Sequence, residues 1–241
     1  MLAIPVSGKR KSADICAAFV RGAKGQGGDA AVFYGVDDSN VVQFRKIRAS
    51  KRPWFYIDNS YFDCARGTHY RITKNGIQHS GLGVTTGARL RDLGVTVKRW
   101  RENGEHILVC PQSADFMDYV IGSARDWTND VTVSLRLFTK REIRIREWNR
   151  DKIEAAATIA NDLRSAWALV TYSSAAAISA LIEGVPVFSM AGAAALMSGK
   201  LSEIEAPFMP YGRERFLGVL ADNQWTLDEI ASGSAWRALH S

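Results

Sequence analysis

The sequence WALVTYSSAAAISALIEGVPVFS, residues 167–189, decides the fold. It begins with a short apolar run, residues 168–172, whose β-branched and aromatic content is typical of a buried parallel strand. An alanine-rich stretch of high helix propensity follows and ends at Gly184. A second short apolar run, residues 185–188, comes directly afterwards. The order strand, helix, strand predicts a βαβ unit.

The turn between the first strand and the helix carries two consecutive hydroxyl residues, Ser173 and Ser174. The N-terminus of a helix has free N–H donors and a partial positive charge, which suit a phosphate. In open α/β sheets, ligands bind at the carboxyl ends of the strands. We therefore expect a phosphate-binding turn here. The alternative is that the serines only cap a core helix.

Length and composition indicate a globular α/β protein of one large or two small domains, with 241 residues, 46% hydrophobic and 23% charged. The three cysteines lie far apart, and their odd number argues against a disulfide framework, so we expect a reducing cytoplasm. The first residues do not form a signal peptide, and the apolar residues 175–197 are interrupted after about half a membrane span. We expect a protein without a membrane span.

The net charge of +6 and the pI near 9.3 favour polyanionic partners without selecting nucleic acid, nucleotide or acidic glycan. The basic residues gather in four runs, each of which has a solvated helix or loop face as its alternative interpretation. The runs are residues 9–11, 45–52, 89–101 and 140–150.

The first third of the chain reads as a Rossmann-like domain. A short strand at residues 2–6 leads through Gly8 and Lys9 into a helix at residues 13–22, and residues 30–34 read as the next strand. The spacing of a Walker A phosphate loop is absent.

An aromatic strand, residues 54–57, ends at Asp58. A carboxylate at that position faces the ligand side of a parallel sheet, so Asp58 is the leading candidate for a general base or an acceptor-binding group. The alternative is a turn-forming aspartate. Asn59, Tyr61 and His79 are further acceptor-side candidates, together with Gly8 and Lys9. No histidine or cysteine spacing indicates a metal site.

A second set of elements begins near residue 106. Residues 89–105 read as a basic linker, residues 106–110 as a new strand followed by Gln112 and Ser113, and residues 114–124 as a helix. We therefore predict an N-terminal domain of residues 1–105 and a C-terminal domain of residues 106–241.

Arg144 and Arg146 alternate with isoleucines, so on a strand both arginines project from one face. Two guanidinium groups there can clamp a diphosphate by bidentate hydrogen bonds, and the alternative is a polar edge strand. A helix over residues 151–165 is expected next. The last helices, with a capping box at Thr226 and Glu229, are expected to pack back on the first domain.

The order of these features resembles that of GT-B-type glycosyltransferases, above all small glycosyltransferase-like proteins of bacteria and their phages and, more distantly, capsule-polysaccharide sugar transferases. The likeness is carried by residues 144–146, 168–187 and 224–236, all in the second half of the chain. It implies two Rossmann-like domains that face a crevice, with the acceptor in the first domain and a nucleotide sugar, such as a UDP-sugar, in the second. No other cofactor is implied, and the missing DxD motif fits metal-independent members.

The resemblance gives roles to six residues. Ser173 and Ser174 would receive the donor phosphates, Arg144 and Arg146 would neutralise the leaving nucleotide, and Gln112 and Ser113 would line the same crevice. The chain departs from the family pattern at Ser179, where many members have an acidic residue that holds ribose hydroxyls, and it is shorter than typical members.

Two acceptors fit the sequence: a hydroxymethylated base in phage DNA, favoured by the positive charge, and a bacterial surface glycan. A flipped base would need aromatic partners, which Trp54, Tyr56, Tyr61 and Phe62 offer. The competing class is a non-catalytic nucleotide- or nucleic-acid-binding α/β protein. Donor turnover distinguishes the two classes, and the sequence leaves the donor sugar and the oligomeric state open.

Overall fold

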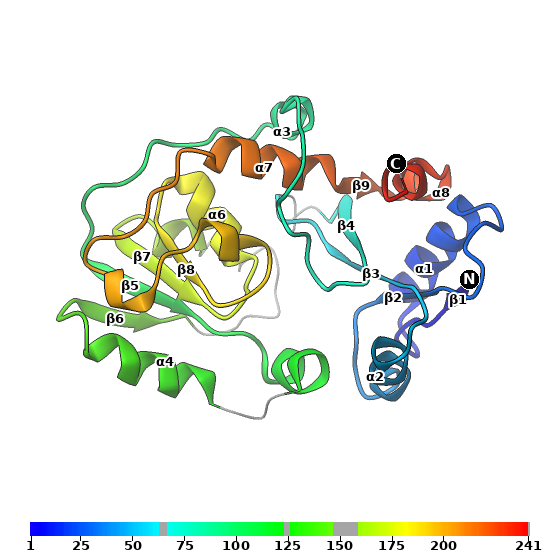
Figure 1. Ribbon diagram of the computed structural model, residues 1–241, viewed down its shortest axis with the longest axis horizontal. Helices are drawn as coiled ribbons and strands as arrows, with labels where there is room; N and C mark the ends of the chain where they lie inside the picture. Colours follow the sequence, from blue (N-terminus) through cyan, green and yellow to red (C-terminus); the bar gives the residue numbers. More distant parts are fainter. Residues whose placement is uncertain (63–66, 123–125, 147–158, 241) are drawn as a thin grey trace. The chain divides into compact units, whose positions relative to one another are not determined.

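Two separate β-sheets organise the chain, which the computed structural model describes for residues 1–62, 67–122, 126–146 and 159–240 (Figure 1). Each sheet is the centre of its own unit. Residues 80–105, which the sequence analysis assigned to the N-terminal domain, cluster with the second sheet, and the C-terminal end clusters with the first. Unit 1 comprises Met1–His79, Ala114–Ser123 and Asn223–Ser241, and unit 2 comprises Ser80–Ser113 and Ala124–Asp222.

Unit 1 contains a mixed sheet in the order β1-β2-β3-β4-β9. Strands β1, β2 and β3 are parallel, whereas β4 runs antiparallel to both β3 and β9. From the sequence alone, residues 70–77 read as a hairpin of their own. The structure instead pairs β4 with the preceding aromatic strand, β3. The elements are β1 Leu2–Ala3, α1 Arg10–Gly22, β2 Ala31–Tyr34, α2 Val41–Ala49, β3 Trp54–Asn59, β4 His69–Lys74, β9 Gln224–Thr226, α8 Leu227–Ala231 and α9 Ser234–Ala238.

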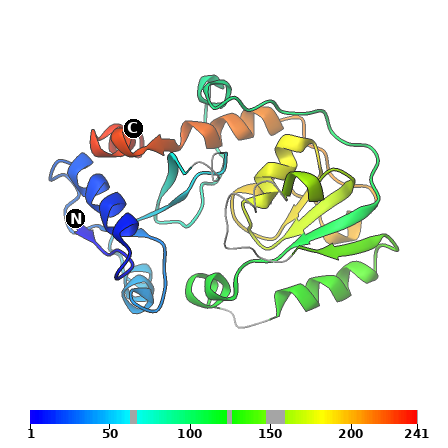
Figure 2. The ribbon, with the colours of Figure 1, turned by 180° about the vertical axis from the view of Figure 1, so that it is seen from behind.

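Side chains alternate between the two faces of β2 and β3 and build two cores. On one face, Phe19 of α1 packs against Phe55 and against Trp236 of the C-terminal segment. Figures 1 and 2 show this C-terminal segment (red) beside α1 (blue). The predicted capping box is confirmed, because Thr226 Oγ1 accepts the N–H of Glu229 at 3.2 Å and the Glu229 side chain accepts the N–H of Thr226 at 2.7 Å. The last helices thus complete the core of unit 1.

The opposite face of the unit 1 sheet packs Phe33 and Tyr56 against Phe44 of α2. It also receives a π-helical turn, Phe116–Ile121, whose Val120 is buried in the same cluster. The sequence places a helix at this point in the second domain. The apolar side chains of this turn instead contribute to the core of unit 1.

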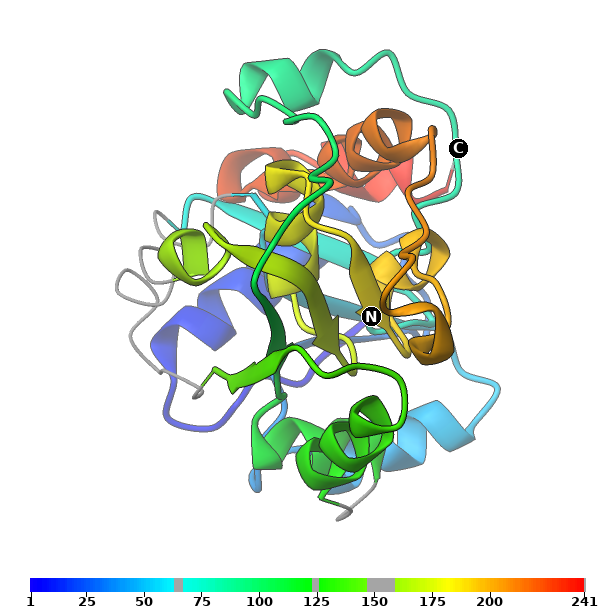
Figure 3. The same cartoon turned by 90° about the vertical axis from the view of Figure 1, so that its left-hand side faces the viewer.

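Unit 2 contains a parallel sheet in the order β6-β5-β7-β8. The predicted βαβ unit is confirmed as β7, α6 and β8, and the parallel pairing of these strands explains their almost continuous burial. Figure 3 shows α4 (green) and α6 (yellow) as separate layers around this sheet. The elements are α3 Ala88–Asp92, β5 His106–Cys110, α4 Trp127–Arg136, β6 Glu142–Ile145, β7 Ala166–Thr171, α6 Ala176–Glu183, β8 Val187–Ser189, short 3₁₀ turns at Ala193–Met197 and Leu201–Glu203, and α7 Arg213–Asp222.

The expected linker, residues 89–105, begins within α3 and then binds the end of α6. The N–H of Lys98 donates to Ile182 O at 2.8 Å, and the N–H of Arg101 donates to Gly184 O at 2.7 Å. Gly184 has φ +77°, and a Cβ there would lie 1.9 Å from Arg99 O, so only glycine fits. This stretch is therefore a packed part of unit 2.

The helix expected over residues 151–165, including its proposed start, lies mostly outside the described residues, although residues 159–162 are helical. Among the helices that the structure describes, none is both long and apolar enough to cross a bilayer.

Candidate functional site

The carboxyl ends of the parallel strands in unit 2 bring together most of the donor-side residues. Gln112 and Ser113 follow β5, Ser173 and Ser174 follow β7, and Arg146 follows β6. Because β5, β6 and β7 are parallel, these positions lie along one edge of the sheet.

Side-chain hydrogen bonds fix the turn between β7 and α6. The hydroxyl of Thr171 donates to Cys110 O at 2.6 Å and accepts the N–H of Ser174 at 3.1 Å. The amide of Gln112 donates to Ser173 Oγ at 2.8 Å. The tip of β5 is therefore tied to the tip of β7 through side chains, and the turn is preorganised.

Ser174 holds the first turn of α6, because its Oγ accepts the N–H of Ala176 at 3.2 Å. Its hydroxyl proton remains a donor. The N–H of Ala175 meets no acceptor among the residues that the structure describes. One backbone donor, one hydroxyl and the positive end of the helix dipole are thus available to an anion at this turn. Ser173 is only 5% exposed and accepts a hydrogen bond from Gln112, so it is less accessible to a ligand than Ser174.

The two arginines differ in position and in partners. Arg146 lies beyond the end of β6, and its Nε donates to Asp162 Oδ2 at 3.0 Å. Its charge partly opposes the burial that raises the pKa of Cys110 at the end of β5. Arg144 lies two residues earlier and donates to both oxygens of the Glu142 carboxylate, at 3.0 and 2.8 Å. This carboxylate raises the pKa of Arg144.

The expected clamp of two arginines is therefore not assembled at the carboxyl edge. One residue, Ile145, lies between Arg144 and Arg146. Arg144 pairs in register with Leu108 in the middle of β5, and burial and then Arg144 lower the pKa of His106 at the start of that strand. Arg146 is the arginine that the structure brings to the edge.

An aromatic pair that the sequence analysis missed lies beside the serine turn. The rings of Trp127, at the start of α4, and Tyr172 meet edge to face with centroids 6.4 Å apart. Trp127 Nε1 donates to Met190 Sδ at 3.0 Å, just after β8. The position of Tyr172 directly before Ser173 is a signal in the sequence that could have marked it as a site residue. Its contact with Trp127 could not be predicted in this way, because the two residues lie far apart in the sequence.

Cys110 ends β5 within this edge, but burial raises the pKa of its thiol to about 12. A thiol in that state does not supply a thiolate nucleophile near neutral pH. Among the described residues, the edge therefore offers hydroxyls, amides and the guanidinium group of Arg146, which is paired with the Asp162 carboxylate.

In unit 1, the carboxyl end of β3 holds an ion pair between Asp58 and Arg71 of β4. Arg71 Nη2 donates to Asp58 Oδ2, and Arg71 Nη1 donates to Asn59 O at 2.8 Å. The other carboxylate oxygen, Oδ1, accepts the N–H of Asn59 at 2.7 Å. Each oxygen of Asp58 thus already accepts a hydrogen bond. The sequence analysis placed Arg71 in a hairpin and missed this pairing.

The remaining acceptor-side residues also lie in unit 1. Tyr61 is buried under the Arg71 guanidinium group, 4.4 Å from the ring centroid, and burial raises its pKa. Asn59 Oδ1 accepts from the Tyr34 hydroxyl at 3.0 Å. His79 is partly buried, which lowers its pKa.

Gly8 and Lys9 form the turn before α1. Gly8 has φ +71°, and an added Cβ would meet nothing within 4 Å, so the turn is open as well as left-handed. Lys9 Nζ lies 3.6 Å from Asp37 Oδ2. The backbone of this turn therefore lies beside the exposed ammonium group of Lys9, which already has the Asp37 carboxylate as a neighbour.

Among the described residues there is no group of three or more side chains that could hold a metal ion.

No family model and no curated protein matches the chain. Solved structures match it over nearly its full length. The Thermosulfurimonas dismutans KpsC beta Kdo 2,4 transferase is 12% identical, with a TM-score of 0.53, and the match covers 93% of this chain and 91% of the transferase chain. The KpsC beta Kdo 2,7 transferase of the same organism is 10% identical, with a TM-score of 0.52 and coverage of 99% and 100%. The chain therefore has a Rossmann-like, glycosyltransferase-like α/β fold.

Proposed function

We propose that the protein is a glycosyltransferase whose unit 2 binds a nucleotide-linked sugar at the carboxyl edge of its parallel sheet. The observation that carries the proposal is the turn between β7 and α6, with Ser174, the free N–H of Ala175 and the Gln112–Ser173 contact. The fold supports it, because solved structures with this fold are named as Kdo transferases.

In this proposal the donor phosphate accepts hydrogen bonds from the Ala175 N–H and the Ser174 hydroxyl. The dipole of α6 and the charge of Arg146 then stabilise the negative charge that develops on the leaving nucleotide. Such fixed donors act without reorganisation during the reaction, so the residues of this edge need not provide a nucleophile. The edge-to-face pair of Trp127 and Tyr172 offers ring surface beside the turn, where we place the nucleobase.

The general base is a separate proposal. Asp58 is our candidate, and it must exchange its contact with Arg71 for an acceptor hydroxyl in order to act. Asp58→Asn keeps the size of the side chain, and we expect it to lower the transfer rate while nucleotide affinity is retained.

The test is donor consumption by the purified protein with UDP-, GDP- and CMP-linked sugars, including nucleotide-activated Kdo. We expect one donor to be bound and consumed, and Ser174→Ala to weaken nucleotide binding about tenfold, as for the loss of one charge-assisted hydrogen bond. Ser134→Ala is the matched control, because Ser134 is bonded within α4 to Asp130 O.

If no donor is consumed but nucleotide binding depends on Ser174, the non-catalytic nucleotide-binding class replaces the transferase. If Ser174→Ala changes nothing, the phosphate site is not at this turn.

The acceptor is either a glycan or a hydroxymethylated base in DNA, and the net charge of +6 is the observation that keeps DNA in consideration. Binding of a polyanion through phosphate contacts weakens steeply with added salt. An absence of salt-sensitive DNA binding removes the DNA acceptor and leaves the glycan.

A further inference from the structure

A cavity of about 300 Å³ lies in unit 1 at the amino ends of β2 and β3. Ala30 and Pro53 directly precede these strands, and Lys74 ends the antiparallel strand β4, where it pairs with Phe55. The cavity therefore opens at the sheet edge opposite to Asp58. The lining residues are Gln26, Gly27, Ala30, Pro53, Phe55, Lys74, Trp236 and His240.

Three rings form one side of the cavity. His240 lies on Trp236 with ring centroids 4.1 Å apart and an interplanar angle of 32°, and Phe55 lies 5.3 Å from Trp236. Phe55 and Trp236 are almost fully buried and form the floor, whereas His240 is exposed at the mouth. A flat ring entering here meets aromatic partners in the tilted geometries that such rings prefer.

Hydrogen bonds orient the polar atoms of the cavity. Trp236 Nε1 donates to Gln26 Oε1 at 3.1 Å, which leaves the Gln26 amide NH₂ as a donor. His240 Nδ1 lies 2.8 Å from Trp236 O. Because a carbonyl only accepts, Nδ1 carries a proton and the orientation of the ring is fixed.

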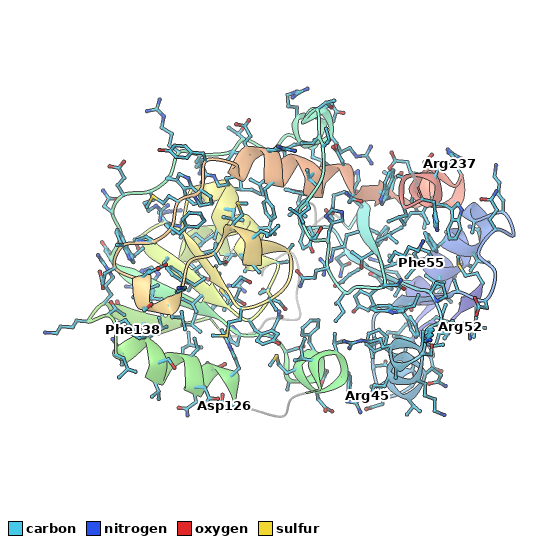
Figure 4. The ribbon with its side chains drawn as sticks, viewed as in Figure 1. Arg45, Arg52, Phe55, Asp126, Phe138 and Arg237 are labelled. Atoms are coloured by element: carbon cyan, nitrogen blue, oxygen red, sulfur yellow. The ribbon has the colours of Figure 1, made fainter. Side chains whose placement is uncertain are left out.

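Basic side chains predominate around the cavity. Among the described lining residues Lys74 is the charged one, and none carries a carboxylate. Arg52 and Arg237 flank the lining residues Pro53 and Trp236 in the sequence, and Asp29 flanks Ala30. Figure 4 shows Phe55 in the interior of unit 1 and these two arginines at its periphery. An anionic group is therefore favoured at the mouth.

We propose that this cavity is a binding site for a small planar aromatic anion. The ring lies against Phe55, Trp236 and His240, and the carboxylate or phosphate binds the ammonium group of Lys74. The volume lies at the lower end of that of small-molecule sites and suits a compact ligand. The cavity is in unit 1 and the donor turn is in unit 2, so this proposal is tested independently of the transferase proposal.

Two probe pairs test the proposal on the full chain: indole carboxylate against indole carboxamide, and adenosine monophosphate against adenosine. Within each pair the ring is constant and the charge differs. Binding is measured by calorimetry and by the shift of the Trp236 indole N–H resonance, which Trp236→Phe assigns among the seven tryptophans.

We expect at least one anionic probe to bind saturably and to shift the Trp236 resonance. Lys74→Met should weaken that binding about tenfold, and His240→Ala should weaken it as well, since both residues are exposed and their replacement leaves the core intact. Lys51→Met, which removes an exposed cation that does not line the cavity, should leave it unchanged.

Preference for the indole acid identifies a carboxylate ligand, and preference for the monophosphate identifies a nucleotide. The proposal is overturned if neither anion shifts the Trp236 resonance, if the uncharged partners bind equally well, or if Lys74→Met binds as the wild type does.

Discussion

The two sheets end differently at the carboxyl ends of their parallel strands. In unit 1, an antiparallel strand follows β3 directly, and its Arg71 neutralises Asp58. In unit 2, parallel neighbours flank β7 on both sides, and the edge retains hydroxyls, an amide and the N–H of Ala175, which meets no acceptor among the described residues. An added antiparallel strand brings its side chains to the edge where a parallel sheet would bind a ligand. The same strand-end position therefore forms an ion pair in one unit and, in our proposal, an anion-binding turn in the other.

The first test of this difference between the units is to remove the ion pair between Arg71 and Asp58. Arg71 has a side chain that is 8% exposed, against 28% for Asp58. We expect Arg71→Met to lower the free energy of unfolding by about 3–5 kcal/mol, because it leaves a partly buried carboxylate without its cation. Denaturant unfolding followed by circular dichroism measures the change.

The control is Arg10→Met, which breaks the exposed pair with Asp14 and should cost about 0.5 kcal/mol or less. Equal unfolding midpoints for the Arg71 and Arg10 variants would show that the pair in unit 1 is not structural.

The second prediction compares the two arginines of unit 2. Arg146→Met should weaken nucleotide binding about tenfold or more, because Arg146 is the cation at the edge that holds the serine turn. Arg144→Met should change the affinity less than twofold, because the guanidinium group of Arg144 already binds both oxygens of the Glu142 carboxylate. Titration calorimetry with the donor nucleotide measures both. A loss of affinity in Arg144→Met as large as or larger than that in Arg146→Met would contradict this and support a phosphate clamp made of both arginines.

The third prediction concerns the segment that supplies β9 to the unit 1 sheet. Thr226→Ala removes one half of the capping box at the start of α8 and should cost about 1 kcal/mol of stability. Thr226→Ser keeps the hydroxyl and should unfold at nearly the wild-type midpoint. A loss of stability in both variants would indicate that the threonine methyl group, and not the cap, is important.

The smallest effect is a pH dependence centred on His106 in unit 2. His106 is 1% exposed, and neither ring nitrogen has a hydrogen-bond partner among the described residues. Burial and then Arg144 lower its pKa, whereas the carboxylates of Glu142 and Glu105 oppose the shift in part. The unfolded state therefore binds the proton more readily.

The stability contributed by a neutral His106 is complete above about pH 6.5 and falls as the pH drops below that value. His106→Gln should flatten this part of the profile of unfolding free energy against pH. His79→Gln is the comparison in unit 1, where burial also lowers the pKa but the ring is less buried. An unchanged profile in the His106 variant would place the titration elsewhere.

Local sequence patterns predicted several elements of the fold. The serine turn, the helix ended by Gly184 and the capping box at Thr226 each depend on residues within a few positions of one another, and the structure has all three. The helix expected at residues 114–124 was assigned to the second domain, but most of this segment belongs to unit 1. The linker at residues 89–105 was assigned to the first domain, but it belongs to unit 2. Their amphipathic or basic character does not specify which sheet they pack against, since that choice depends on partners far away in the sequence.

The sequence by itself determined the βαβ unit and its hydroxyl-rich turn, because strand and helix propensities and glycine geometry act over short distances. Tertiary structure decided the partner of Asp58, the pairing of Arg146 with Asp162, and the contact of Trp127 with Tyr172. It also decided that Trp236 and His240 line a cavity with Phe55. These contacts arise from strand order and from the return of the C-terminal segment, and no local pattern of residue types encodes them.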